Sequence, residues 1–380
     1  MAAVVDVVYH PTLEYGLIGA IAAAGTFLLT GVAKSFAERV GAVATPRDRD
    51  IHAVAIPRMG GLAMLGGFVL ALFVAKRLPA LQGAFDSGPE FSWILVAALI
   101  ICVIGAIDDR IELDSLTKLA GQILAAAVMV TRGGVQLSEI YIPGSTLSLG
   151  RDLAIPVTIL LTVLTINAIN FIDGLDGLAA GVAAIAAGAF FVFSHRVTSL
   201  DILHVTNVPA LLSAALAGAC LGFLPHNFWP ARIFMGDSGS MLIGLMLSAA
   251  ATTATTTADP QTTFAGALGA FPLALPLLIP IAVLILPLAD LSLAVIRRVR
   301  RGQSPFAPDK QHLHHRLLEL GHSQRRAVIL LYFWTALLAF GGVGLAIFHG
   351  PWVVLSVIAG GAVLGILLVV IPRVQRPRHL

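Results

Sequence analysis

The stretch LAIPVTILLTVLTINAINFIDGLDGLAAGVAAIAAGAFFVFS, residues 153–194, decides the fold class of this chain. It holds two apolar runs, 153–170 and 178–194, each about long enough to cross the roughly 30 Å hydrocarbon core of a bilayer as a helix. The polar side chains at the junction of the runs are Asn167, Asn170, Asp173 and Asp176. Polar groups without partners are costly beside apolar surroundings, so this cluster favours a functional explanation.

The rest of the chain repeats the same alternation of long apolar runs and short polar junctions. Of its 380 residues 57% are hydrophobic and 12% are charged, and the mean hydropathy is +0.90. The runs are continuous in Ala, Leu, Val, Ile and Gly, which excludes the short alternating segments of a membrane barrel. We therefore expect one all-α polytopic membrane domain over 1–380 with about eleven transmembrane helices. The expected spans are 14–34, 59–76, 91–107, 116–131, 153–170, 178–194, 209–225, 237–257, 265–296, 327–348 and 351–372.

The distribution of basic residues predicts the orientation. With the N-terminus outside, the C-terminus and every odd-numbered connection lie on one side, which then holds 19 of the 24 Lys and Arg residues. The positive-inside rule makes that side cytoplasmic. The first run lacks a basic start and is expected to be a retained span. Both cysteines lie inside apolar runs, which argues against a disulfide framework or a thiolate metal site.

The ninth run, 265–296, needs a separate explanation. Its length of about 32 residues would extend roughly 48 Å, too far for one untilted helix. Four prolines, Pro272, Pro276, Pro280 and Pro287, lie along it. We expect one proline-broken crossing, because two crossings would carry the basic segment after it to the outside. Among the outside connections, the one around Pro143 and Gly144 is expected to form a small hairpin.

Two polar clusters come before the junction at 167–176 and fall on the predicted cytoplasmic side. The first, DRDIHAVAIPRMGG, contains His52 and Arg58, and by itself reads as a positively charged anchor before a helix. The second places Asp108 and Asp109 at the end of one span. Lys118 and Gln122 open the next span, one turn apart on one face. Acidic residues at a helix C-terminus oppose the helix dipole, so the carboxylate pair is either a frayed end or a Mg²⁺ site or base.

The junction at 167–176 and the start of the 237–257 span give the third and fourth clusters. Asn170, Asp173 and Asp176 recur every three residues, on one face if helical, but the glycine and closing glutamate of a calcium loop are missing. Asp237 and Ser238, between glycines, form either an N-terminal cap or an anion and metal site.

The fifth cluster lies in the connection SPFAPDKQHLHHRLLELGHS. Its candidate residues are His312, His314, His315 and Arg316. A zinc site is disfavoured, because no carboxylate or cysteine at ligand spacing completes a tetrahedron and the neighbouring Arg and Lys residues repel a cation. A basic, histidine-rich loop suits phosphate groups better.

Together these clusters predict phosphoryl transfer at a membrane surface. Such chemistry needs carboxylates for a divalent ion, cationic groups for the phosphates and little covalent participation from the protein. A secondary transporter is the main alternative of another class, but it would place its polar residues in mid-span and show internal repeats. A non-catalytic scaffold would not need metal-type clusters at several helix ends.

The motifs DDR…LTKLAGQ, NAINFIDGLDGLAAG, IFMGDSGS and DKQHLHHRLLELGHS, in this order, resemble the polyprenyl-phosphate N-acetylhexosamine-1-phosphate transferases of glycosyltransferase family 4. The resemblance covers nearly the whole chain. It implies transfer of a sugar 1-phosphate from a UDP-sugar to undecaprenyl or decaprenyl phosphate, with release of UMP. It also implies a requirement for Mg²⁺, with Mn²⁺ as a substitute, and an active site on the cytoplasmic face of the plasma membrane. No nucleic acid polymer is expected as a partner, and a homodimer is compatible with this family.

The resemblance also implies roles for individual residues. It makes Asn170 and Asp237 the metal ligands. It gives catalytic roles to Asp108, Asp109, Lys118, Asp173 and Asp176. The first two lie near the acceptor phosphate, Lys118 contacts a phosphate, and the last two shape the nucleotide pocket. It gives substrate contacts to His52, Arg58, Asn167, His312, His314, His315 and Arg316.

The mechanism and the donor each leave an alternative open. Either the polyprenyl phosphate attacks directly with Asp108 as base, or an aspartate first takes the phospho-sugar; we favour direct attack, because a phosphate monoester is already mostly dianionic at neutral pH. The forms HAVAIPRMGG and HLHHRLL are similar to the WecA/TagO-type branch, which implies UDP-N-acetylglucosamine as donor and a lipid-linked sugar for lipopolysaccharide or teichoic acid synthesis. The alternative is an MraY-type donor carrying N-acetylmuramoyl-pentapeptide.

Overall fold

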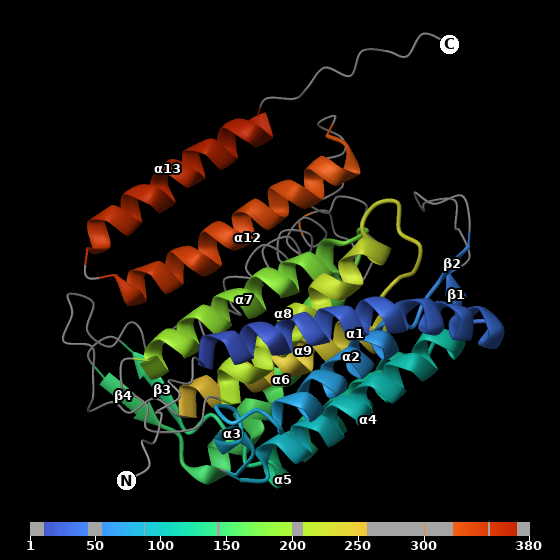
Figure 1. Ribbon diagram of the computed structural model, residues 1–380, viewed down its shortest axis with the longest axis horizontal. Helices are drawn as coiled ribbons and strands as arrows, with labels where there is room; N and C mark the ends of the chain where they lie inside the picture. Colours follow the sequence, from blue (N-terminus) through green and yellow to red (C-terminus); the bar gives the residue numbers. More distant parts are fainter. Residues whose placement is uncertain are drawn as a thin grey trace, which may run out of the picture.

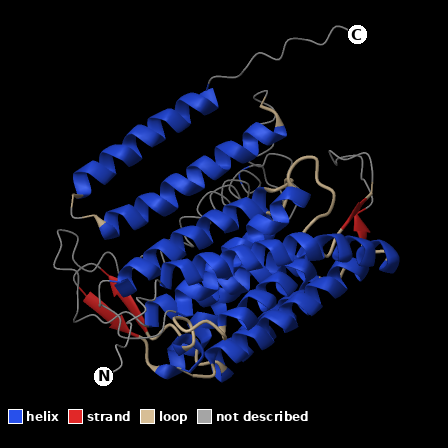
Figure 2. Cartoon of the chain, viewed as in Figure 1, coloured by secondary structure: helices blue, strands red, loops and turns tan. Residues whose placement is uncertain are grey.

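The computed structural model describes residues 11–44, 55–86, 88–142, 145–199, 208–256, 300, 322–348 and 350–370. In these ranges the chain is almost entirely helical (Figures 1 and 2). The helices are α1 (Pro11–Val40), α2 (Gly60–Ala75), α3 (Gly83–Asp86), α4 (Glu90–Ile111), α5 (Ser115–Arg132), α6 (Arg151–Ile172), α7 (Leu178–Ser199), α8 (Val208–Asn227), α9 (Gly236–Thr256), α12 (Gln324–Ile347) and α13 (Pro351–Val370). Two antiparallel hairpins join β1 (Val43–Ala44) to β2 (Ile56–Pro57) and β3 (Glu139–Ile142) to β4 (Ser145–Ser148).

The all-α class is confirmed, and ten of the expected spans coincide with a helix. Eight of the described helices are long and apolar enough to cross a membrane, namely α1, α4, α6, α7, α8, α9, α12 and α13. The helix α2 is apolar but has only 16 residues. The expected span 265–296 and its four prolines lie outside the described residues. The predicted hairpin at 143–144 is confirmed by the pairing of β3 with β4, whereas the β1–β2 pair was not predicted.

Local sequence explains several helix ends near the site. The side chain of Asp114 caps α5 by accepting from the backbone N–H groups of Leu116 at 3.0 Å and Thr117 at 3.1 Å. The helix α4 ends where Glu112 adopts a left-handed conformation with φ of 49°. The sharp connection between α4 and α5 follows from these two features.

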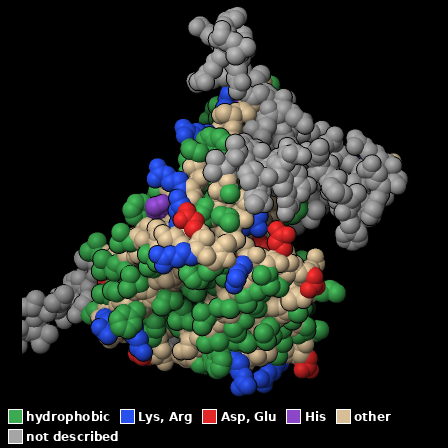
Figure 3. Space-filling model, turned by 90° about the vertical axis from the view of Figure 1, so that its right-hand side faces the viewer, with side chains coloured by type: hydrophobic (Ala, Val, Ile, Leu, Met, Phe, Trp, Pro, Cys, Tyr) green, Lys and Arg blue, Asp and Glu red, His purple; other side chains and the backbone are tan. Residues whose placement is uncertain are grey.

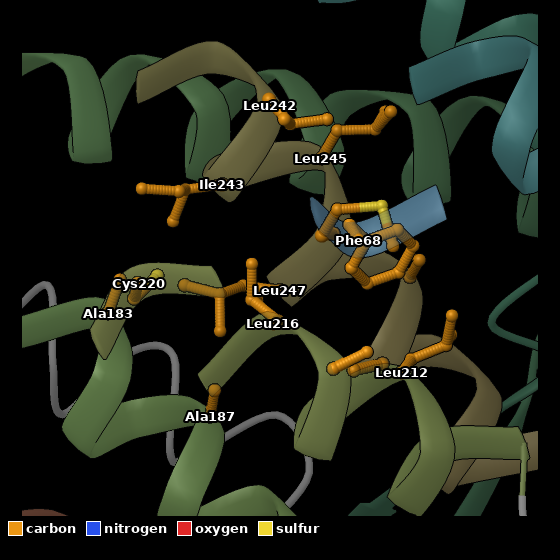
Figure 4. Packing of buried hydrophobic residues seen from close by; sticks show 14 of the residues in the cluster. Phe68, Ala183, Ala187, Leu212, Leu216, Cys220, Leu242, Ile243, Leu245 and Leu247 are labelled. Carbon is orange, nitrogen blue, oxygen red and sulfur yellow. The ribbon is translucent and has the colours of Figure 1, made fainter. Parts of the chain in front are cut away.

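The helix α9 forms the centre of the bundle, and its apolar window is completely buried. It packs against α4, α6, α8 and α2. Figure 4 shows Leu242, Ile243, Leu245 and Leu247 of α9 beside Phe68 of α2 and the α8 side chains Leu212, Leu216 and Cys220. A helix that is buried all round cannot shift without disturbing its neighbours, so residues at its first turn are held firmly.

Small residues bring α1 close to α8. A Cβ atom on Gly218 would lie 2.1 Å from the carbonyl oxygen of Gly19, and one on Gly222 would lie 2.1 Å from that of Ala23. Such close backbone approach is typical of packing between membrane helices, where small residues replace the hydrophobic driving force. By contrast, α13 is largely exposed and contacts α12. The outer helices therefore present apolar side chains outward, as expected for contact with lipid.

Candidate active site

The described residues of four of the predicted polar clusters meet at one end of the bundle, on the right in Figure 1. There α4 and α6 end, and α2, α5 and α9 begin. The backbone N–H groups of Gly60 and Gly61 at the start of α2 donate to the carbonyl oxygens of Phe234 and Met235, just before α9. Figure 3 faces this end and shows acidic and basic side chains among the hydrophobic ones. Four junctions distant in sequence thus share one surface.

Asp237, in the first turn of α9, is the centre of the polar contacts. Its Oδ1 atom accepts a hydrogen bond from the Asn170 side-chain amide, and its Oδ2 atom accepts one from the Lys118 ammonium. Asn170 also donates to Ser240 Oγ at 2.8 Å. Lys118 Nζ reaches Asp108 Oδ2 at 3.1 Å and forms an ion pair with both carboxylates. The structure therefore joins α4, α5, α6 and α9 through one carboxylate and its partners.

The adjacent carboxylates Asp108 and Asp109 do different things. Asp108 faces Lys118, and its Oδ1 atom accepts from the backbone N–H of Leu113 at 2.7 Å, which fixes the turn into α5. Asp109 points the other way, to the start of α9. Its oxygens accept from the backbone N–H of Asp237 at 2.8 Å, from the N–H of Ser238 at 3.2 Å and from Ser238 Oγ at 2.8 Å.

Asp109 thus supplies the N-terminal cap of α9 from a neighbouring helix. This contact requires α4 and α9 to approach closely, and glycine makes it feasible on both sides. A Cβ atom on Gly105 would lie 2.4 Å from the backbone nitrogen of Ser238, and one on Gly236 would lie 2.3 Å from the Asp109 carboxylate. Gly236 also has a φ of 68°, which disfavours other residues. Asp109 therefore positions Asp237, while Asp108 faces the Lys118 ammonium.

The Asp173 carboxyl lies just beyond the end of α6. Asn170, Asp173 and Asp176 would share a face only within one helix, but α6 ends at Ile172 and the chain turns through 173–177. Desolvation, with repulsion from the Asp237 and Asp109 carboxylates, raises the pKa of Asp173 to about 8, and the positive charge of Arg58 opposes this rise. Arg58 therefore lies within electrostatic reach of the acidic cluster.

Asp176 and Asn227 join the loops 173–177 and 228–235. Asp176 Oδ2 accepts from the backbone N–H of Ala231 at 2.8 Å. Asn227 Oδ1 accepts from the N–H of Gly177 at 3.0 Å, and its amide donates to the carbonyl of Ile233 at 3.1 Å. Asn227 was not predicted, although it follows the end of an apolar run, as other predicted site residues do. Asp176 thus holds the loop that leads to Asp237.

The helix α12 supports the same loops from outside. The Tyr332 hydroxyl donates to the carbonyl of Gly177, and the Arg325 guanidinium donates to the carbonyl of Trp229 at 3.0 Å. A Cβ atom on Gly181 would lie 2.0 Å from the Tyr332 ring, so the glycine allows α12 to pack this closely on α7. Neither Tyr332 nor Arg325 was predicted.

Asn167 lies one turn before Asn170 and pairs with Gln122 of α5. Its amide donates to Gln122 Oε1 at 2.6 Å and to the carbonyl of Val163 at 2.8 Å. These bonds, rather than a contact with Asp237, account for its amide hydrogens. The remaining predicted residues, His52, His312, His314, His315 and Arg316, lie outside the described residues.

The donor atoms at Asp237 suit a hard divalent cation. Asp237 and Asp108 supply carboxylate oxygens. Asn170 supplies an amide oxygen if its side-chain amide is flipped, since the O and N positions of an amide are assigned from its hydrogen-bond partners. Mg²⁺ binds through one or two carboxylates and completes its shell with water and substrate phosphates. Among the described residues no group of three or more His, Cys, Asp or Glu side chains has metal-site geometry. The oxygen donors of Asp237, Asp108 and Asn170 fit Mg²⁺ that is shared with a phosphate.

Comparison with known proteins gives a consistent result. The family model described as glycosyl transferase family 4 matches residues 91–255. Over 373 aligned residues the chain is 50% identical to decaprenyl-phosphate N-acetylglucosaminephosphotransferase of Mycobacterium tuberculosis strain H37Rv, covering 96% of this chain and 91% of the relative. The corresponding protein of Mycobacterium leprae is 49% identical, covering 96% and 92%. Undecaprenyl-phosphate alpha-N-acetylglucosaminyl 1-phosphate transferase of Escherichia coli K12 is 30% identical, covering 84% and 80%.

Proposed function

Since this chain belongs to glycosyl transferase family 4, we propose that it transfers N-acetylglucosamine 1-phosphate from UDP-N-acetylglucosamine to a membrane polyprenyl phosphate. The products are UMP and polyprenyl-diphospho-N-acetylglucosamine, a lipid-linked sugar for cell-envelope synthesis. The relatives at 50% and 49% identity over 96% of the chain carry this activity in their names. The observation in this chain that supports the chemistry is that Lys118 and Asn170 both bond Asp237, while Lys118 also bonds Asp108.

Mg²⁺, or Mn²⁺ in its place, is the cofactor in this proposal, and Asp237 and Asn170 hold it with Asp108 beside them. When bound, it would neutralise the donor pyrophosphate and stabilise the charge that develops on the leaving UMP. Asp237 needs to be rigid for this role. Its backbone N–H is fixed by Asp109 and its helix is buried at the centre of the bundle.

The acceptor phosphate attacks the phosphorus that carries the sugar. A bond forms from an acceptor oxygen to that phosphorus, and the bond from the phosphorus to the bridging oxygen breaks, so that UMP leaves with the electron pair. Lys118 holds the acceptor phosphate by donating a charge-assisted hydrogen bond. Asp108 keeps Lys118 in place and accepts the residual proton of a monoprotonated acceptor.

Direct attack suits this geometry better than a phospho-aspartate intermediate. Both oxygens of Asp109 accept hydrogen bonds from α9, which direct its carboxylate toward the start of that helix and make it a weaker nucleophile. Asp108 is tied to Lys118 and to the Leu113 backbone. A polyprenyl phosphate is mostly dianionic at neutral pH and needs little activation.

The donor occupies the side of the site nearest Arg58 and the loop 173–177. Arg58 and, in the same proposal, His52, His312, His314, His315 and Arg316 bind the pyrophosphate or sugar. Asp173 and Asp176 shape the nucleotide pocket, the latter through its bond to the Ala231 backbone. The site faces the cytoplasm, where UDP-sugars are made, and the protein is a multi-pass component of the plasma membrane.

The reaction can be tested with purified protein in detergent. Given decaprenyl or undecaprenyl phosphate and Mg²⁺, the protein is expected to release UMP from UDP-N-acetylglucosamine and to stop when the metal is chelated. A preference for UDP-N-acetylmuramoyl-pentapeptide would leave the reaction class intact and refute the donor. Absence of UMP release from both donors with either acceptor would refute the transferase proposal.

A further inference from the structure

A pair of side-chain amides connects α5 to α6 one turn deeper than the site. Asn167 donates to Gln122 Oε1 at 2.6 Å, and Gln122 donates in return to Asn167 Oδ1 at 3.4 Å. Gln122 is only 1% exposed. Its amide also lies 3.5 Å from the sulfur of Met241 on α9. The pair therefore touches the three helices that carry Lys118, Asn170 and Asp237.

The pair and Met241 come from the same three helices as Lys118, Asn170 and Asp237, one helical turn further into the bundle. Gln122 follows Lys118 by four residues on α5, and Met241 follows Asp237 by four on α9. Asn167 precedes Asn170 by three on α6. Residues three or four apart lie on the same helical face, so each helix contributes one side chain to the site and one to the layer beneath it.

Asn167 is out of place for packing alone. It is exposed, on a face of α6 whose other large side chains are apolar: Leu160 is 57% exposed, Leu164 is 53% exposed and Phe171 is 42% exposed. An amide on an apolar outer face is costly unless it is hydrogen-bonded. A leucine at this position would match its neighbours.

We propose that Gln122 and Asn167 are positioning residues that set the separation of α5 and α6, and thereby hold Lys118 and Asn170 at the correct distance from Asp237. The inference rests on the proposed function, because it concerns the metal and phosphate ligands of that site. Lys118 and Asn170 come from different helices and act on opposite oxygens of one carboxylate. A directional amide pair fixes their spacing, whereas apolar contacts of the same size would not.

The test removes the pair without leaving an unpaired amide. Gln122→Met with Asn167→Leu replaces both partners by apolar groups of similar shape, a change that is often nearly neutral for stability. The matched control is Ser248→Ala, which breaks the buried bond between Ser248 Oγ and Thr162 Oγ at 2.8 Å, also between two bundle helices. Ser248 is about 16 Å along α9 from Asp237, by the helical rise of 1.5 Å per residue.

Two measurements are made on each variant. The first is the melting temperature in detergent as Mg²⁺ is titrated, and the second is the rate of UMP release at saturating Mg²⁺ as the polyprenyl phosphate is varied, which gives its KM. The double apolar variant is expected to keep its melting temperature without metal, while the Mg²⁺ midpoint of thermal stabilisation rises about 10-fold, the lower end of the effect of outer-shell partners. Ser248→Ala is expected to leave the midpoint unchanged. The exchanged pair Gln122→Asn with Asn167→Gln, which conserves the summed side-chain length, is expected to recover most of the affinity lost by either single change.

Other outcomes would overturn the proposal. An unchanged midpoint in the double apolar variant, with wild-type protein active, would show that the pair is structural only. A higher KM for the polyprenyl phosphate at an unchanged Mg²⁺ midpoint would make Asn167 an acceptor contact instead. A wild-type protein that neither responds to Mg²⁺ nor releases UMP would refute the proposed function itself, which distinguishes that failure from the first two.

Discussion

Asp237 is the residue at which the contacts of the site converge, and it gives the first prediction. Asp237→Asn is expected to reduce UMP release by more than about 100-fold, beyond the usual effect of losing an outer-shell partner. The variant removes a negative charge that both the cation and Lys118 need. The rate is measured over a wide range of Mg²⁺ concentrations. Recovery of the full maximal rate at high Mg²⁺ would contradict the assignment of Asp237 as primary ligand.

Asp108 and Asp109 are neighbours in sequence, and their contacts predict different defects. Asp109→Ala leaves backbone N–H groups at the start of α9 without their acceptor, so we expect a loss of about 1–3 kcal/mol in stability together with lost activity. Asp108→Asn keeps α9 capped, so its melting temperature and its binding of UDP-N-acetylglucosamine are expected to stay near wild type while the rate falls. Thermal melting and donor titration of both variants make the comparison. Equal melting temperatures for the two variants would contradict the capping role.

Asp173 predicts a dependence of stability on pH. Its pKa is about 8 in the folded protein and near 3.9 in an unfolded chain, so between these values the folded state holds the extra proton. Wild-type stability therefore falls as pH rises through this window, and the contribution is lost above the folded pKa. The asparagine of Asp173→Asn does not titrate. The melting temperature of this variant minus that of wild type, both measured without Mg²⁺, is therefore expected to increase from pH 5.5 to pH 8.

Asp114→Asn is the control for this measurement. Hydrogen bonds from Thr117 lower the pKa of Asp114. Its contribution to folding stability therefore changes with pH only in acid, below the range in which Asp173 titrates. Its melting temperature is expected to stay at a constant difference from wild type between pH 5.5 and pH 8. A constant difference for Asp173→Asn as well would mean that the carboxyl is already ionised in the folded protein.

At the scale of helices, the contact of α1 with α8 depends on the absence of side chains. Gly222→Ala places a methyl group where a Cβ would be 2.1 Å from the carbonyl of Ala23, so the helices must separate and we expect a loss of about 1–3 kcal/mol. Gly31→Ala in α1 is the matched control, because nothing lies within 4 Å of its Cβ position. That variant is expected to be neutral or stabilising, since alanine is the better helix former. Melting temperatures in detergent decide the comparison, and equal losses would refute it.

Sequence periodicity predicted these helices well and their ends less well. The expected 91–107 and 153–170 spans became α4 and α6, each a few residues longer, because hydropathy marks the apolar centre and not the polar last turn. The same extension put Asp108 and Asp109 inside α4. A sequence cannot reveal that one of two adjacent carboxylates caps another helix, since that depends on the approach of Gly105 to α9. Similarly, Lys118 and Gln122 were predicted to share a face, but the partnership of Gln122 with Asn167 arises only from packing.

At the scale of the whole molecule, the predicted positions of the polar junctions agree with the described bundle. The connections after α4, α6 and α8 were predicted to share one side, and the bonds from Lys118 to Asp237 and from Asp176 to Ala231 bring them to one end. The bonds do not depend on the charge distribution used for the prediction. Which compartment this end faces follows only from the bias of Lys and Arg.

The orientation of the bundle is therefore the last prediction. Ser115 and Ser138 are both exposed; Ser115 begins α5 and Ser138 follows its other end by six residues, so Ser115→Cys and Ser138→Cys report on the two faces with the same chemical change. The native Cys102 and Cys220 are buried and give little background. A membrane-impermeant maleimide applied to intact cells is expected to label position 138 and not 115, with 115 reacting only after permeabilisation. Labelling of position 115 alone in intact cells would show that the predicted orientation is reversed. The donor site would then face away from the cytoplasmic UDP-sugar.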